Sequence, residues 1–154
     1  MKDLKLKLLI DQLDRKFEHL SSIDRLVSPS EGWIYAIRTA LKMTLKQLGT
    51  KLSITAQSVK EIELREKNGA ITLNTLKEVG NALDMRLVYG FIPKEKTISA
   101  MIEKRAQEIA ETIVLRTSVT MNLEDQGNST ERIKKAIEEM ADEIKREMPR
   151  YLWD

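Results

Sequence analysis

The spacing of capping and apolar residues between Thr44 and Ile62 restricts the possible folds of this chain more than any other feature. Thr44, followed three residues later by Gln47, forms a capping box that opens a short helix. Gly49 supplies a small residue where a second helix can cross the first closely, and Ser53 is a compact residue four positions later. The pattern therefore predicts two short helices joined by a tight turn.

The second helix of this pair begins at Thr55, a good N-cap residue, and is expected to end at Asn68-Gly69, which tolerate the left-handed conformation. Val59 and Ile62, three residues apart, give it a buried face. Its other face is polar. A helix-turn-helix that binds DNA needs this arrangement, because polar side chains near the start of its second helix must reach base edges in the major groove.

Helices are expected over most of the remaining chain, because its 154 residues include only 6 Gly and 3 Pro. Apolar side chains recur at spacings of three and four in several segments, which is typical of amphipathic helices. The expected helices on either side of the central pair span residues 3–20, 28–42, 72–83, 97–122 and 128–148. The fold class is therefore mainly α, with a helix-turn-helix domain and C-terminal helices.

Capping residues mark the ends of several of these helices. Ser28, with Pro29 in the first helical position, predicts a helix start. Thr72 or Asn74 opens the helix that follows the central pair. Pro149 is expected to end the last helix at about Met148, because the residue before a proline is pushed out of the α region.

Residues 86–92 are the one segment with a β pattern, since a run of β-branched and aromatic residues is stopped there by Pro93. A single strand leaves its edges unpaired, so we expect this strand to pair with its copy across a homodimer. The regions expected are an N-terminal helix (1–27), the helix-turn-helix domain (28–84), the strand (85–93) and a C-terminal helical region for dimer support or partner binding (94–154).

Composition excludes several classes of chemistry. The chain has no cysteine, which excludes disulfides, cysteine-ligated zinc and a thiol nucleophile. Its single histidine, His19, excludes zinc sites of the HExxH type. We therefore expect no enzyme activity, no metal and no cofactor. No apolar run approaches the roughly 18 residues of a membrane span, so a cytoplasmic location and no membrane partner are expected.

The charge is balanced overall, with 26 basic and 24 acidic side chains, but it is unevenly distributed. Residues 32–92 hold nine basic and five acidic side chains, whereas residues 93–154 hold eleven basic and thirteen acidic ones. Binding to nucleic acid requires positive charge near the phosphates. The positive excess that could serve this purpose lies in the middle third of the chain.

The segment Leu45–Glu63 resembles the Cro/Xre family of helix-turn-helix DNA-binding domains, and Leu73–Leu83 resembles the helix that closes such a domain. Ser53 stands where the family usually has a turn glycine, and Ala56 where many members have a glutamine. The resemblance implies a transcriptional repressor that binds double-stranded DNA in a sequence-specific manner.

From the pattern of this family, Gln57 is placed to pair with adenine N6 and N7. Lys60 and Arg65 are better placed for phosphates, and Glu61 for cytosine N4. N-terminal amides and a lysine of the first helix can hold a further phosphate. The residues expected to contact DNA are Thr44, Lys46, Thr55, Ala56, Gln57, Ser58, Lys60, Glu61 and Arg65.

A narrower resemblance covers nearly the whole chain and is to the family called mobile mystery protein A. Members resemble antitoxin-like regulators encoded beside a Fic-domain protein, mobile mystery protein B. The resemblance thus implies a Fic-domain partner in addition to DNA. The segments that carry it are Gly32–Ile34, Ala36–Arg38, Ile71–Leu73, Leu87–Tyr89, Thr120–Glu124 and Leu152–Asp154.

Thr120 and Glu124 are the candidate residues for binding this partner. Fic proteins are typically restrained by a helix with the pattern Ser/Thr-x-x-x-Glu-Gly/Asn, whose glutamate pairs with an arginine of the Fic site. Thr120 and Glu124 match its Thr and its Glu, whereas Asp125 departs from it. A carboxylate offered to a guanidinium can bind it in a bidentate manner. The alternative interpretation is that these residues are only a frayed helix end.

Two other functions remain open from the sequence. The chain could be a stand-alone transcriptional regulator without a toxin partner, or a protein-interaction module that has lost DNA binding. Binding to its own promoter region and co-purification with the neighbouring gene product separate these possibilities. The C-terminal Trp153 likewise has two interpretations, because an aromatic tail can cap its own core or dock on a partner.

Overall fold

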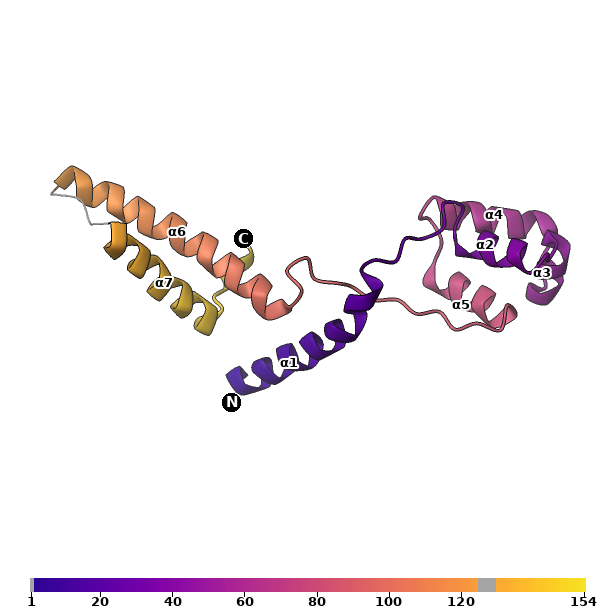
Figure 1. The fold of residues 1–154 in the computed structure, drawn as a ribbon, viewed down its shortest axis with the longest axis horizontal. Coiled ribbons are helices and arrows are strands. Elements are labelled where there is room, and N and C mark those ends of the chain that lie inside the picture. Colours follow the sequence, from indigo (N-terminus) through magenta and orange to yellow (C-terminus); the bar gives the residue numbers. More distant parts are fainter. Residues whose placement is uncertain (1, 125–129) are drawn as a thin grey trace. The chain divides into compact units, whose positions relative to one another are not determined.

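The computed structural model describes residues 2–124 and 130–154 of the chain. These residues are mainly helical, as the sequence predicts (Figure 1). They divide into two compact units. One unit is continuous, Arg25–Gly90, and is called here the four-helix unit. The other combines Met1–Asp24 with Phe91–Asp154 and is called here the three-helix unit. From sequence, the N-terminal helix was expected as a region of its own.

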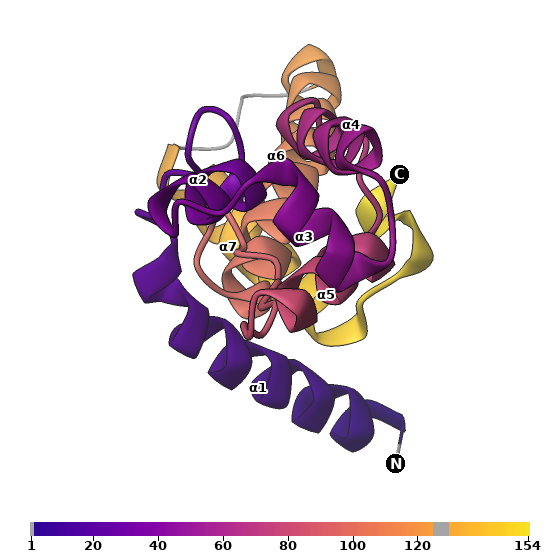
Figure 2. The same ribbon diagram turned by 90° about the vertical axis from the view of Figure 1, so that its right-hand side faces the viewer.

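The three-helix unit consists of α1 (Lys2–Leu20), α6 (Ile98–Glu124) and α7 (Thr130–Glu147), with short 3-10 turns at Ser21–Ile23 and Arg150–Trp153. Helices α6 and α7 lie side by side in both views (Figures 1 and 2). Alanines occupy the centre of their contact, so the two helices can approach closely. The buried residues of this core are Ile102, Ala106, Ala110, Ala141, Ile144 and Leu152.

Asp14 joins α1 to the start of α6 across 84 residues of sequence. Its carboxylate accepts hydrogen bonds from the backbone N–H of Ile98, at 2.7 Å, and from the hydroxyl of Ser99, at 3.0 Å. The first N–H groups of a helix have no partner within the helix. The hydroxyl of Thr97 accepts from the N–H of Ala100 at 3.0 Å, and Asp14 completes this cap from α1. The contact explains why the N-terminal helix belongs with the C-terminal ones.

The four-helix unit contains α2 (Trp33–Ala40), α3 (Leu45–Leu52), α4 (Ala56–Lys67) and α5 (Leu73–Ala82), all labelled in Figure 2. Each helix contributes an apolar side chain to one core, so that the unit has a single buried centre. The caps expected at Thr44, Thr55 and Thr72 are confirmed. The buried core residues are Ile34, Leu48, Val59, Val79 and Leu83.

The helix start expected at Ser28 is wrong. Helix α2 begins at Trp33, after Gly32 at φ +92°, and the N–H of Ile34 donates a hydrogen bond of 2.8 Å to Oε1 of Glu66. A Cβ atom at Gly32 would lie 2.6 Å from this oxygen. The cap comes from α4, 32 residues away, so the local pattern at Ser28 did not decide the helix start.

The strand expected at 86–92 is also wrong, because none of the residues that the structure describes forms a strand. A strand is stable only when another strand takes up its hydrogen bonds. No other segment of the chain has a β pattern, and residues 85–92 run as an irregular connection. Val88, Tyr89 and Phe91, which gave the segment its β character, are exposed.

The C-terminal end follows the prediction from Pro149. Helix α7 ends at Glu147, and Met148 takes a positive φ of 45°. In the last turn Leu152 is fully buried, whereas Trp153 remains 57% exposed, so Leu152 and not the tryptophan fills the core. The guanidinium of Arg105 donates to the carbonyl of Leu152 at 2.7 Å and holds the tail in place. The start that the sequence predicts for α7, at residue 128, lies outside the described residues.

Candidate nucleic-acid interface

Helices α3 and α4 meet at a tight corner that depends on Gly49. A Cβ atom at this position would lie 2.7 Å from the backbone oxygen of Ile54, closer than real Cβ contacts. The N–H of Ile54 donates to the carbonyl of Gly49 at 2.9 Å, and Ser53 takes the left-handed conformation at φ 58°. The small residue and the turn residue expected from sequence therefore occupy the positions where the corner needs them.

Each of the two helices starts with a cap made by its own side chains. In α3, the hydroxyl of Thr44 accepts from the N–H of Gln47 at 3.1 Å, and Oε1 of Gln47 accepts from the N–H of Thr44 at 2.8 Å. In α4, the hydroxyl of Thr55 accepts from the N–H of Ser58 at 3.0 Å, and the two hydroxyls lie 2.9 Å apart. The caps fix where each helix begins.

The inner face of α4 is anchored by an ion pair as well as by apolar packing. Glu63 is buried and pairs with Arg38 of α2, with Nη2 and Oε2 3.2 Å apart. Nη1 of Arg38 also donates to the carbonyl of Met43 at 2.9 Å. The hydrogen bond that Arg38 donates to Glu63 raises the pKa of Arg38, so the guanidinium stays charged. Val59 is fully buried beside this pair.

The outer face of α4 is polar. Gln57, Lys60 and Glu61 are exposed, and Arg65 lies on the same side, 3.8 Å from the carboxylate of Glu61. This face therefore offers an amide, cations and one carboxylate to a partner. Such groups can donate to or accept from base edges and phosphates.

The remaining predicted contact residues lie at the starts of the two helices. Thr44 and Lys46 are exposed at the start of α3, and Thr55 is exposed at the start of α4. Ala56 and Ser58 are half-buried in the first turn of α4. The structure thus places every residue expected to contact DNA on α3 or α4 or at their caps.

Sequence reasoning missed the carboxylates that hold α4 in place. Glu63 and Glu66 lie on the same stripe as Val59 and Ile62, because positions 59, 62, 63 and 66 share one face of a helix. An acidic residue within an apolar stripe indicates a buried partner, since an unpaired buried charge is costly. This signal was present in the sequence, but the partners on α2 were too far away to identify.

The candidate partner residues Thr120 and Glu124 fall in the last turns of α6, and their side chains lie outside the described part of the chain. Within the described residues, no group of three or more His, Cys, Asp or Glu is arranged to hold a metal ion. None of the helices in this part is both long and apolar enough to span a membrane.

Comparison of the chain with known protein families, with curated proteins and with solved structures gave no match.

Proposed function

We propose that this protein is a transcriptional repressor that binds double-stranded DNA through α3 and α4, as a helix-turn-helix of the Cro/Xre type does. The observation that carries the proposal is the two-sided character of α4. Val59 and Glu63 anchor its inner face, while Gln57, Lys60 and Glu61 are exposed on its outer face. A recognition helix needs both properties, because it must be held rigidly while its polar side chains enter the major groove.

The chemistry of the exposed residues assigns each a role. The amide of Gln57 can donate to N7 and accept from N6 of adenine in one plane, which reads a single base pair. Lys60 and Lys46 are flexible cations suited to phosphates, which fix position but carry no sequence information. Glu61 holds Arg65 on the same face at 3.8 Å. Binding of phosphate by Arg65 competes with this exposed pair.

The proposed repressor acts as a homodimer. One helix-turn-helix module buries too little surface for useful specificity, and two modules on half-sites about 34–36 Å apart supply the remainder. A dimer of this kind reads a palindromic operator.

The resemblance to mobile mystery protein A supports a second partner, a Fic-domain protein encoded beside this one. The repressor then acts as the antitoxin of that protein. Co-expression of the two genes followed by affinity purification of the repressor tests this part of the proposal. Recovery of this protein alone would indicate a stand-alone regulator without a Fic-domain partner. In the same system, a Glu124→Gly variant that still forms the complex and fully suppresses the Fic activity would remove Glu124 from the mechanism.

Selection of bound sequences from a random pool of duplex DNA tests the main proposal. The wild-type protein is expected to enrich a palindromic motif, and competition with unrelated duplex should leave the complex intact. A Leu115→Glu variant, changed at an exposed position of α6, serves as a control that should enrich the same motif. Failure of the wild type to enrich any motif, or equal competition by unrelated duplex, would contradict sequence-specific binding.

A further inference from the structure

The four-helix unit contains a pocket with apolar walls, and every residue that lines it belongs to this unit. Its volume is about 330 Å³. Ile37 of α2 and Leu76 of α5 contribute to its walls, together with Leu26 and residues 85–88 from the connecting segments at the two ends of the unit. The pocket therefore lies on the side of the unit formed by α2 and α5, and none of its lining residues comes from α3 or α4.

The wall formed by residues 85–88 is held against α5 by the backbone. The N–H of Met85 donates to the carbonyl of Gly80 at 2.7 Å, and Asp84 takes a positive φ of 55° to make this turn. A Cβ atom at Gly80 would lie 3.0 Å from the carbonyl oxygen of Met85. The segment thus passes close to α5 and shapes the pocket before any ligand enters, as is usual for small-molecule sites.

Several large apolar side chains of this pocket are left in contact with water. Trp33, Met85 and Val88 line it and are 41%, 45% and 61% exposed. Exposed apolar surface that is gathered at one place often marks a binding site. A ligand with an apolar body would remove this surface from water, which is favourable.

Arg86 is the one charged residue that lines this pocket. Its side chain is exposed, and within residues 2–124 and 130–154 its guanidinium has no ion-pair or hydrogen-bond partner. A guanidinium can bind a carboxylate through two parallel hydrogen bonds. The pocket therefore offers an apolar interior beside a single positive charge that is free to pair.

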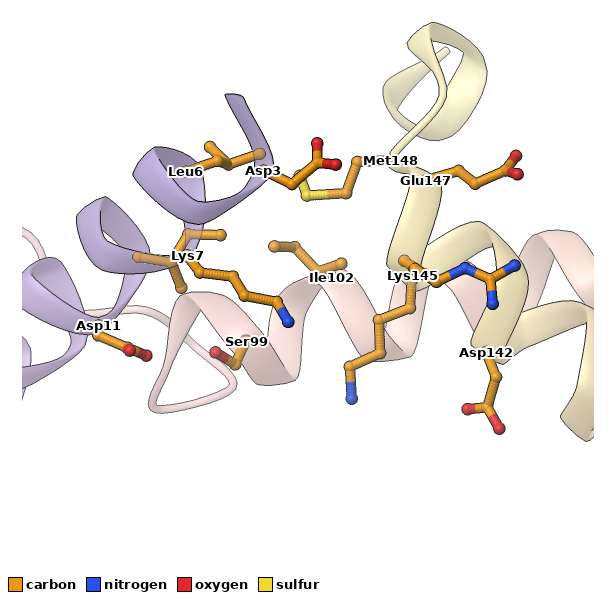
Figure 3. Close-up of a pocket in the computed structure, with 12 residues that line it drawn as sticks. Asp3, Leu6, Lys7, Asp11, Ser99, Ile102, Asp142, Lys145, Glu147 and Met148 are labelled. Carbon is orange, nitrogen blue, oxygen red and sulfur yellow. The ribbon is translucent and has the colours of Figure 1, made fainter. Parts of the chain in front are cut away.

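The groove of the three-helix unit shows the contrast. Figure 3 shows Lys7 and Asp11 on the α1 side and Lys145 and Asp142 on the α7 side, so both signs of charge line that groove. Its charges favour no particular sign of ligand. The pocket beside Arg86 has positive charge only, and its charge is complementary to an anion.

We propose that the pocket of the four-helix unit binds a small amphipathic carboxylate, the anion of a medium-chain fatty acid, with its hydrocarbon chain inside and its carboxylate on Arg86. The volume lies at the lower end of the range of small-molecule sites, which suits one short chain. The inference goes beyond the proposed DNA binding and does not depend on it. Binding of the carboxylate can be measured without DNA, so the two can fail separately.

The fluorescence of Trp33 provides a direct measurement, because Trp33 lines the pocket. The chain has two tryptophans, and Trp153 is 57% exposed in the other unit, so a Trp153→Phe variant isolates the signal of Trp33. Titration of this full-length variant with octanoate should shift the emission to shorter wavelength and saturate. Hexanoate should bind roughly tenfold more weakly, because it buries two CH₂ groups fewer.

Arg86→Gln in the same background tests the role of the charge. Its affinity for octanoate should fall by about tenfold or more, whereas its affinity for the uncharged 1-octanol should not change. Lys51→Gln removes the same charge from an exposed residue of α3 that does not line the pocket, and it should bind octanoate unchanged. Because Arg86 is exposed, the circular dichroism of both variants should match that of the parent.

Several results would overturn the inference. A Trp33 emission that does not respond to octanoate, or that responds without saturating, would mean that the pocket holds no such ligand. Equal affinity for hexanoate and octanoate would place the hydrocarbon chain outside the pocket. Equal affinity of the parent and Arg86→Gln for octanoate would show that the carboxylate is not bound by Arg86.

Discussion

Gln57 and Ser58 are neighbours in the first turn of α4, yet their polar atoms are differently engaged. The hydroxyl of Ser58 lies 2.9 Å from that of Thr55 within the cap, whereas Gln57 is exposed. We expect Gln57→Ala to weaken operator binding by about 1–3 kcal/mol and to relax preference at one base pair. Binding to a set of singly substituted operators, measured by fluorescence anisotropy, checks this. Unchanged affinity and preference would mean that α4 does not read bases through Gln57.

The pair of Arg38 and Glu63 is a residue-scale feature that contributes to the stability of the four-helix unit. Both side chains are nearly buried, with exposed fractions of 11% and 9%. Glu63→Ala leaves a buried guanidinium without its carboxylate, and we expect a loss of about 3 kcal/mol in the free energy of unfolding. Urea unfolding followed by circular dichroism measures it.

The exposed pair of Glu31 and Lys67 provides the control for this measurement. Its atoms are 3.0 Å apart, but both side chains are about half exposed, so Glu31→Ala should cost less than about 1 kcal/mol. The stabilisation from the Arg38–Glu63 pair also depends on pH, because folding raises the pKa of Arg38. This stabilisation is fully present below the pKa that Arg38 has in the unfolded chain. It is lost only as the pH rises through the higher pKa that Arg38 has in the folded protein. Equal losses in both variants would contradict the importance of burial.

At the scale of elements, the corner between α3 and α4 depends on one missing side chain. Gly49→Ala places a Cβ atom 2.7 Å from the backbone oxygen of Ile54. The cost of overpacking, about 1–3 kcal/mol, exceeds the gain of about 1 kcal/mol in helix propensity. We therefore expect lower thermal stability together with a loss of DNA affinity, because α4 is displaced. Thr50→Ala, on the exposed side of the same helix, should preserve both properties in parallel measurements.

The cap that α1 provides to α6 gives a second prediction at this scale. Asp14→Ala removes the acceptor for the N–H of Ile98 and should cost about 1 kcal/mol. Faster hydrogen exchange at residues 98 and 99 is the expected local sign. Glu18→Ala, an exposed change on the same helix, should leave this exchange unchanged. If the two variants exchange alike, the carboxylate of Asp14 is not the cap.

The same elements show how far the sequence could predict this fold. The caps at Thr44, Thr55 and Thr72 were predictable because each bonds to a backbone group three residues away. The start of α2 was not, because its cap comes from Glu66. The strand at 86–92 was predicted from β propensity, which depends on the surroundings of a segment more than on its residues. Contacts between residues close in the sequence can be predicted from the local pattern, whereas contacts between distant residues cannot.

In the candidate interface, too, only the features that depend on nearby residues could be predicted from the sequence. Gln57 and Lys60 were predictable as exposed residues from the helical period of the segment. The residues that hold α4 against α2 were missed, since each bond between Glu63 or Glu66 and its partner joins residues at least 25 positions apart.

For the whole molecule, the distribution of charge determines how the proposed DNA binding should respond to salt. The net charge of the chain is only +2, so we expect any long-range attraction to DNA to come from the cations of the four-helix unit. We expect Lys60→Ala to weaken binding to all duplex sequences alike and to reduce the slope of log K against log salt by about one unit. Titrations at several salt concentrations measure the slope. A loss confined to the operator would make Lys60 a base-reading residue instead.

The three-helix unit is built from both ends of the chain, and this affects the order in which the two units can fold during synthesis. The four-helix unit is complete once residue 90 has left the ribosome, but α1, synthesised first, must wait for α6 and α7. At about 5–20 residues per second, the roughly 60 residues that follow take on the order of 3–13 s to synthesise. During that interval the leucines of α1 have no helix of their own unit to pack on, and we therefore expect chaperones to bind the nascent chain.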